Sequence, residues 1–428
     1  MARRTRRSTG PKDRDVVAPA SLAELLGEFE GCFSAWTFPV FLALACGLVA
    51  QTARRTVCGM LVGAGLSETW SHHRAHRFFS HARWSLEEVS AVLARLVVRL
   101  LVGADQAVSV AIDDTLFSRR GPKVHAASWF HDGSSVGDKK IGYGNNWVIL
   151  AIVVRLGFVK RPVALPVGFA LVRKDSDDSS RLVLARRLVE ALAVALPGRR
   201  IDVVADCAYA GKVLRGLPDG VTWTTRLRSN ASLYELAPAR TGKPGRPRLK
   251  GVKLASLAEL ANSAAFSPAS VTRYGTTTTV SVSVICCLWY GVFGPEAVQV
   301  VLVRDKSKTG YDIALATTDL EASAAQVIER YASRWSIEVA IEDAKQLGGV
   351  GPGPQPPTRR CRTYRPVRTH HQHARRLLVR DRWVPPRRRP SGTKVGPLVP
   401  GEGPALGPRH ARQAPPCHHR RAISARRP

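Results

Sequence analysis

The sequence lacks the features that would mark a secreted, disulfide-bonded or membrane-spanning protein. Its eight cysteines include no C-x-x-C pair, which disfavours a zinc ribbon or a disulfide scaffold and fits a reducing compartment. The apolar run at 38–50 has only 13 residues, too few to cross a bilayer, so we expect a buried helix there. No apolar segment directly follows the basic N-terminus, so we identify no secretory signal.

Acidic residues are also scarce. The chain has 33 Asp and Glu against 64 Lys and Arg, a net charge of +31. Residues 351–428 hold 19 basic and 2 acidic residues, and residues 1–350 still carry 45 basic and 31 acidic residues, a net +14. Such a charge favours polyanions, above all nucleic acid. We expect a cytoplasmic protein that associates with the nucleoid through DNA and has no membrane partner.

The middle of the chain predicts an α/β fold. Apolar, strand-like runs occur at 107–113, 146–156 and 162–172, and an amphipathic helix at 178–196 precedes a further strand at 200–206. The order strand, strand, strand, helix, strand is that of the ribonuclease-H-like arrangement. In this arrangement the first and fourth strands are neighbours, and we expect both to end at aspartates.

Changes in composition divide the chain into six segments. We predict a flexible basic arm, a helical N-terminal domain that binds DNA, two parts of a catalytic core separated by a β-rich insertion, and a disordered polycationic tail. The arm is 1–17 and the helical domain is 18–104. The catalytic core comprises 105–227 and 311–350, the insertion between them is 228–310, and the tail is 351–428.

Three carboxylates in this arrangement are candidates for a shared metal site. Asp114 and Asp206 follow strand-like runs, and Glu338 lies in a later helix that can pack across them. Carboxylate oxygens are the ligands that Mg²⁺ prefers, and Mn²⁺ can substitute. The alternative is that these are separate helix caps or surface charges.

The segment 329–346 is rich in helix-forming residues and contains no Gly or Pro. On a helix that advances 100° per residue, four of its polar groups fall within about 60° of one another. These groups are Tyr331, Arg334, Glu338 and Lys345. A solvated helix face with spaced ion pairs would also produce such a stripe. A carboxylate that binds a metal, flanked by groups that bind a phosphate backbone, is the more specific hypothesis.

This spacing resembles the Y-x2-R-x3-E-x6-K signature of bacterial insertion-sequence transposases of the DDE class. The stretches "IDDT" and "VVADCAYAG" are similar to the contexts of that family's two aspartates, and the resemblance extends over roughly 20–350. It implies a ribonuclease-H-like core, Mg²⁺, cleavage of DNA at the element's terminal inverted repeats and strand transfer into target DNA. A homodimer in the synaptic complex is expected.

The resemblance also implies roles for particular residues. Asp114, Asp206 and Glu338 are the implied catalytic metal ligands, and Asp114 is preferred to its neighbour because the family's first aspartate directly precedes threonine. The implied contacts to the terminal DNA backbone are Tyr331, Arg334 and Lys345.

Three local alternatives remain open. Glu342 lies close to the stripe and is able to replace or support Glu338. Asp113 points to the opposite face of its strand from Asp114 and is therefore left out of the predicted site. Arg246 and Arg248, in the loop "KPGRPRLK", are candidate DNA minor-groove contacts, although a solvated loop explains them equally well.

The last part of the chain differs from the rest in composition. Residues 351–428 contain 15 of the 28 prolines, half of the 12 histidines and no phenylalanine. A change of reading frame near residue 350 would explain this, and so would an authentic basic tail that strengthens DNA binding. Two rivals to an active transposase follow: a catalytically inactive, DNA-binding remnant or repressor, and a ribonuclease-H-like nuclease without strand transfer.

Overall fold

The computed structural model describes residues 18–51, 55–119, 121, 123–133, 140–176, 179–239 and 246–348. These residues belong to one compact unit. The predictions for the arm at 1–17 and for the tail at 351–428 lie outside the described residues. Within the described part of the chain, no helix is both long enough and apolar enough to span a membrane.

The N-terminal part is helical, as predicted. Its helices are α1 (Ala20–Gly27), α2 (Phe38–Ala50), α3 (Val57–Gly63), α4 (His72–Ser80) and α5 (Leu86–Leu101). Helix α2 is the apolar run and is largely buried. It packs closely on α3, because a Cβ atom placed at Gly47 would lie 1.8 Å from the Met60 carbonyl oxygen. Ser85 caps α5 by accepting a hydrogen bond from the Glu88 amide at 3.2 Å.

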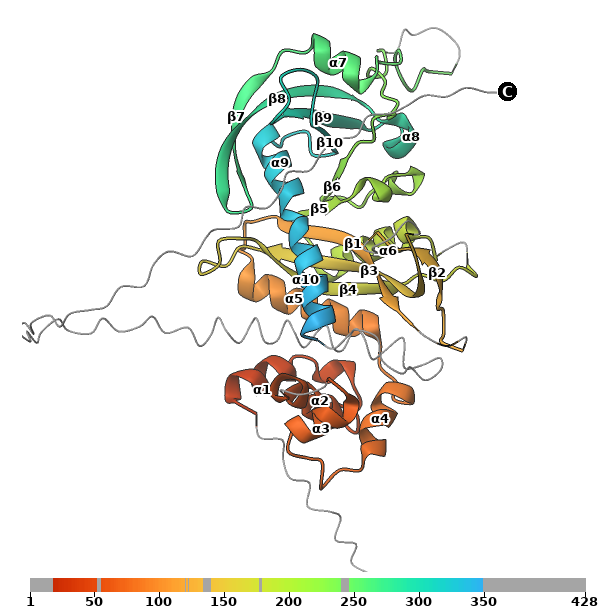
Figure 1. Ribbon diagram of the computed structural model, residues 1–428, viewed down its shortest axis with the longest axis vertical. Coiled ribbons are helices and arrows are strands. Elements are labelled where there is room, and N and C mark those ends of the chain that lie inside the picture. Colours follow the sequence, from red (N-terminus) through yellow and green to blue (C-terminus); the bar gives the residue numbers. More distant parts are fainter. Residues whose placement is uncertain are drawn as a thin grey trace, which may run out of the picture. The chain divides into compact units, whose positions relative to one another are not determined.

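The remaining elements build one ten-stranded sheet (Figure 1). Its strands are β1 (Val108–Ser118), β2 (Ser128–His131), β3 (Ile141–Val154), β4 (Val163–Leu171), β5 (Ile201–Ala205), β6 (Val221–Arg226), β7 (Ser267–Arg273), β8 (Thr276–Leu288), β9 (Ala297–Arg304) and β10 (Ile313–Thr317). The order is β2-β3-β1-β5-β6-β10-β9-β8-β7, and β4 pairs with β3.

The half of the sheet that precedes the insertion has the predicted ribonuclease-H-like topology. Strand β1 is antiparallel to β3 and parallel to β5, and β5 is parallel to β6. The predicted first and fourth strands, β1 and β5, are therefore neighbours. The predicted end of the first strand is wrong, because β1 continues to Ser118 by pairing with β3, with Asp114 opposite Val148. Asp113 and Asp114 thus lie in the middle of a strand.

The block between β6 and the final helices is β-rich, as predicted. Strands β7, β8 and β9 form an antiparallel run, and β10 joins β9 to β6, so that the insertion continues the sheet. The short helices α7 (Leu257–Ser263) and α8 (Tyr290–Phe293) belong to this block. After Asp206 the chain forms two 3₁₀ turns, η3 (Cys207–Tyr209) and η4 (Lys212–Leu214).

Helices cover the two faces of the core sheet. Helix α6 (Arg181–Ala195) packs on one face, where Ile112 belongs to the same apolar cluster as Val189. Helices α9 (Ala324–Ser333) and α10 (Trp335–Gln346) lie on the other face, where Ala111 is in a cluster with Ile337. Side chains alternate along a strand, so adjacent residues of β1 face different helices. The fold class is a mixed α/β core with a β-rich insertion and a helical N-terminal part.

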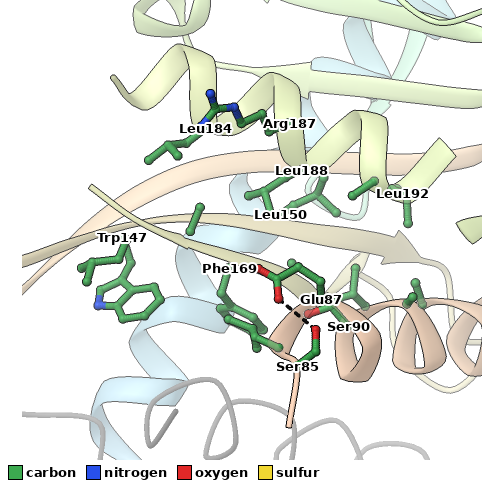
Figure 2. Close-up of a pocket in the computed structure, with 18 of the residues that line it drawn as sticks. Ser85, Glu87, Ser90, Trp147, Leu150, Phe169, Leu184, Arg187, Leu188 and Leu192 are labelled. Atoms are coloured by element: carbon green, nitrogen blue, oxygen red, sulfur yellow. Dashed lines mark hydrogen bonds between the residues drawn. The ribbon is translucent and has the colours of Figure 1, made fainter. Parts of the chain in front are cut away.

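A hollow of about 760 Å³ lies between α5, α6 and strand β4 (Figure 2). Its walls are mostly apolar and include Leu150, Phe169 and Leu188. Near its α5 end, the Ser85 hydroxyl donates a hydrogen bond to Glu87 Oε2 at 3.0 Å. None of the predicted site residues lines this hollow, so the candidate active site lies elsewhere.

Candidate active site

Asp206 lies beside the middle of β1. It directly follows β5, its backbone is extended, and its Oδ1 accepts the amide hydrogen of Cys207 at 2.5 Å. Because Ala205 pairs with Ile112 in the parallel ladder, the next residues along the two strands, Asp206 and Asp113, are also neighbours. The strand end at Asp206 is as predicted.

Asp113 and Asp206 lie on the face of the sheet that α10 covers. Ala111 and Val204 are paired and belong to the same apolar cluster as Ile337 of α10. Asp113 and Asp206 are each two residues further along, and residues two apart in an extended chain point to the same face. The alternation therefore brings both carboxylates to the side that carries Glu338.

Arg334 connects Asp113 to Glu338. It lies between α9 and α10, where the Ile337 amide bonds to the Arg334 carbonyl at 3.0 Å and the helix tightens locally. Its guanidinium contacts Asp113 Oδ2 at 3.1 Å and Glu338 Oε1 at 2.9 Å. The Arg334 side chain is only 13% exposed. The predicted stripe therefore borders the sheet at this point and is not a fully solvated helix face.

Tyr331 extends the same cluster toward Asp206. Burial raises the pKa of the Tyr331 hydroxyl. The positive charge of Arg334 lowers this pKa, and the negative charge of Asp206 raises it. Lys345 lies at the other end of the stripe and is half-buried, with its Nζ 5.8 Å from the centre of the Phe117 ring. The structure thus places the four residues of the predicted stripe along the flank of one nearly continuous helix.

Asp114 lies on the opposite face, toward α6. Its carboxylate accepts hydrogen bonds from the Tyr209 hydroxyl and from Asn146 Nδ2, both at 2.9 Å, and pairs with Arg181 Nε at 3.2 Å. Burial, followed by the charge of Asp114, raises the pKa of Tyr209. Three donors already engage this carboxylate, and the fold does not bring it together with Glu338. Its role as a metal ligand stays a prediction.

The environment of Asp113 is unusual for a carboxylate. Burial raises its pKa to about 6, against the opposing effects of Arg334 and of the Asp114 amide, and the charges of Asp114 and Glu338 raise it further. Burial makes the charged form of a carboxyl group costly. A nearby cation therefore stabilises that charged form more in a buried group than in a solvated one. Such perturbed groups concentrate at functional sites.

The other candidates are more peripheral. Glu342 is exposed and accepts a hydrogen bond from Gln346 Nε2. Arg246 and Arg248 are exposed in the connection between β6 and α7. Their proposed DNA contacts stay predictions.

The residues of the cluster suit a hard divalent cation. Among the described residues, no three carboxylate, imidazole or thiol groups converge closely enough to form a metal site as they stand. Asp113, Asp206 and Glu338 nevertheless supply only oxygen donors, which Mg²⁺ and Mn²⁺ prefer. Arg334 Nε is buried and has no hydrogen-bond partner in the described part of the chain. The Nε–H group of Arg334 can therefore donate a hydrogen bond to an additional anionic partner.

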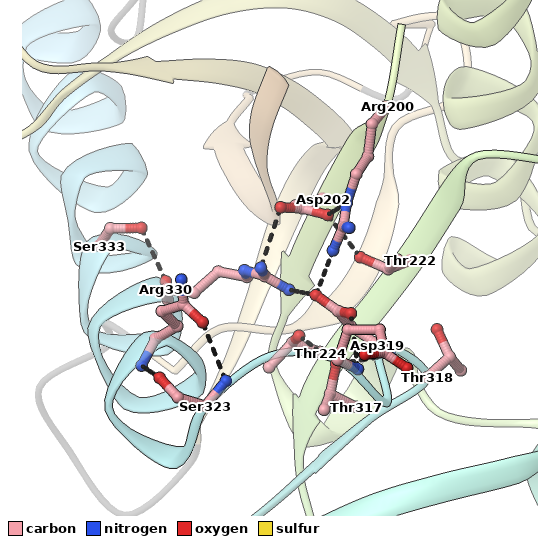
Figure 3. A network of polar contacts seen from close by, with 12 residues as sticks. Arg200, Asp202, Thr222, Thr224, Thr317, Thr318, Asp319, Ser323, Arg330 and Ser333 are labelled. Carbon is pink, nitrogen blue, oxygen red and sulfur yellow. Dashed lines mark hydrogen bonds and ion pairs between the residues drawn. The ribbon is translucent and has the colours of Figure 1, made fainter. Parts of the chain in front are cut away.

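A second charged cluster, which no sequence pattern predicts, anchors α9 (Figure 3). Arg330 contacts Asp202 Oδ2 at 2.9 Å and Asp319 Oδ2 at 3.1 Å, and Arg200 also pairs with both aspartates. Both aspartates are buried, with 4% of each residue exposed. The available signal was Asp202, a lone charge within the otherwise apolar strand sequence "IDVVA". This cluster joins α9 to β5 one residue before Tyr331.

Comparisons with known proteins identify a family for this chain. The family described as DDE superfamily endonuclease matches residues 28–284, more than half of the chain. A search of curated proteins gives no match. A similar solved structure is the cryo-EM structure of a piggyBac transposase synaptic complex with hairpin DNA, at 12% identity and a TM-score of 0.39, covering 83% of this chain and 71% of that chain. The chain belongs to the DDE superfamily endonuclease family.

Proposed function

We propose that this protein is a metal-dependent transposase of the insertion-sequence type. It would cleave DNA at the terminal inverted repeats of its own element and join the ends to target DNA, as a homodimer in a synaptic complex. The observation that carries the proposal is the position of Asp113 and Asp206 on neighbouring strands, beneath the helix that presents Glu338. We therefore assign the metal to Asp113, Asp206 and Glu338, and not to the Asp114 that the sequence motif favours.

Each part of the cluster has a role in phosphoryl transfer. When bound, Mg²⁺ supplies Lewis-acid stabilisation of the phosphate and lowers the pKa of a bound nucleophile. The three carboxylates hold the metal and, together, give the site its negative charge. Arg334 and Lys345 contact the phosphate backbone and offset that charge, and Tyr331 orients the strand by hydrogen bonding. Backbone contacts of this kind position the DNA without reading its sequence.

Carboxamide substitutions test the assignment. Asp113→Asn, Asp206→Asn and Glu338→Gln should each abolish Mg²⁺-dependent cleavage of DNA that carries the element's ends, because a neutral amide is a poor Mg²⁺ ligand. Binding of the same DNA should persist. Asp114→Asn is the matched control: it should reduce stability but, where folded, should retain cleavage. Loss of cleavage in folded Asp114→Asn, with retention in Asp113→Asn, would restore the motif-based assignment.

The products of the reaction separate the transposase from its rivals. Joining of the cleaved ends to a second DNA molecule is expected of a transposase. Cleavage without joining would indicate a nuclease, and binding of the ends without cleavage would indicate an inactive remnant or repressor. Binding to chromosomal DNA would place the protein at the nucleoid.

A further inference from the structure

A second groove lies on the other flank of the α9–α10 helix pair. Its volume is about 480 Å³, and its walls come from the β3–β4 connection, the β7–β8 turn and the outer side of α9 and α10. Figure 1 shows the β7–β8 hairpin beside α9. Large apolar side chains that are 39–54% exposed gather here: Phe158, Val159, Tyr274, Trp335 and Val339. A solvent-exposed cluster of this kind marks a binding surface.

Tyr274 occupies a costly backbone position at the rim of this groove. It forms the two-residue β7–β8 turn with Gly275, and both have positive φ, 54° and 83°. Turns with two positive φ values favour Asn or Gly at the first position, and a bulky side chain there is strained. Tyr274 is 54% exposed, so its ring gains little from packing in the protein itself. Backbone strain combined with an exposed aromatic ring indicates a contact with a ligand.

The turn and the β3–β4 connection meet directly. A Cβ atom placed at Gly275 would lie 3.6 Å from the Lys160 Cβ. The backbone of the turn therefore lies next to Lys160, and Tyr274 and Lys160 line the same groove.

The charge of the groove is positive. Among the described residues that line it, the cations are Arg155, Lys160 and Arg161, all exposed, and the only carboxylate is Glu329. That carboxylate accepts the Thr272 amide hydrogen at 2.6 Å and so is engaged within the protein. An apolar protein segment would contact the aromatic rings but would leave three cations without counterions. Anionic ligands with flat apolar groups satisfy both features.

We propose that this groove binds unpaired nucleotides of DNA. Bases stack on Trp335 and Tyr274, and the phosphates lie along Arg155, Lys160 and Arg161. Aromatic platforms beside cations are the general means of holding single-stranded nucleic acid. The inference rests on the proposed function for the presence of DNA. The residues of the groove are distinct from the metal-binding cluster, and Trp335 directly follows Arg334, so a strand held here lies close to the helix that carries Glu338.

The test is the binding of a fluorescein-labelled oligothymidylate, followed by fluorescence anisotropy in the presence of EDTA. The oligonucleotide has about ten nucleotides, a length within the site sizes common for such surfaces. A fully paired duplex of the same length is the second probe. Trp335→Ala removes one platform, and Tyr274→Asn removes the other while giving the turn a residue it prefers, so the melting temperature should be maintained or raised. Trp129→Ala is the matched control, because Trp129 is 59% exposed and does not line the groove.

Each groove variant should weaken binding of the single strand about tenfold, with little change for the duplex, and the control should match the wild type. Unchanged single-strand affinity in both variants would overturn the proposal. Equal weakening for the two probes would also overturn it, because the groove would then be a general cationic surface. A change in sedimentation of the Trp335→Ala protein with unchanged affinity would assign the groove to self-association instead.

The result does not depend on catalysis. Wild-type protein that fails to cleave DNA in Mg²⁺ would contradict the proposed function, but would leave the oligothymidylate comparison intact. Conversely, a protein that cleaves and joins element ends, but whose groove variants bind the single strand normally, would contradict only the groove.

Discussion

At the scale of single residues, Asp113 has the most distinctive chemistry. Its pKa is raised from 3.8 to about 6, chiefly by burial, so the folded state binds its proton more tightly than the unfolded state. Protonation therefore stabilises the fold fully below about pH 4, and this contribution is lost as the pH rises through 6. Without metal, the wild type should therefore lose stability relative to the Asp113→Asn variant as the pH rises. The difference between their free energies of unfolding should change by up to about 3 kcal/mol between pH 4 and pH 7. Parallel pH profiles in urea denaturation would contradict the raised pKa.

The two adjacent aspartates also show what a sequence can predict about a site. Alternation along a strand correctly predicts that Asp113 and Asp114 point in opposite directions. Which face carries the later helix depends on the pairing of β1 with β5 and on the packing of Ile337 against Ala111, contacts between residues more than ninety apart. No local pattern encodes that choice. The position of Asp206, by contrast, follows from a short apolar strand that ends before it.

At the scale of elements, the attachment of α9 to the sheet depends on buried charge. Replacing Arg330 by Met should lower the free energy of unfolding by about 3 kcal/mol, because two buried carboxylates would then share only Arg200. Arg228→Met, at an exposed position, is the control and should change stability by less than about 0.5 kcal/mol. Equal unfolding midpoints for the two variants in denaturant would show that the cluster in Figure 3 does not hold the helix.

Most elements of the core could be predicted because each has a strong local pattern. The apolar runs of β3 and β4 and the amphipathic α6 are examples. The second half of β1 was missed because "DTLFS" is only partly apolar and becomes a strand by pairing with β3. Arg330, Asp202 and Asp319 resemble surface charges in sequence, and only the tertiary fold buries them together.

At the scale of the whole molecule, positive charge dominates. The net charge of +31 makes nonspecific binding to DNA the expected background. A residue that contacts phosphate can be distinguished from this nonspecific background because its replacement changes the salt dependence of DNA binding. Lys345→Gln and Arg334→Gln should each reduce the slope of log affinity against log salt concentration for duplex DNA by about 0.9. Unchanged slopes would show that these two side chains do not contact DNA phosphates.

We infer that Asp113, Asp206 and Glu338 share one metal site and that Asp114 is not part of it. Binding of Mn²⁺ to the full-length protein, followed by electron paramagnetic resonance, tests this without DNA or catalysis. The wild type and Asp114→Asn should bind Mn²⁺ with similar affinity, whereas Asp113→Asn, Asp206→Asn and Glu338→Gln should bind it at least about tenfold more weakly. Wild-type affinity in Asp113→Asn, together with loss of binding in folded Asp114→Asn, would contradict the account.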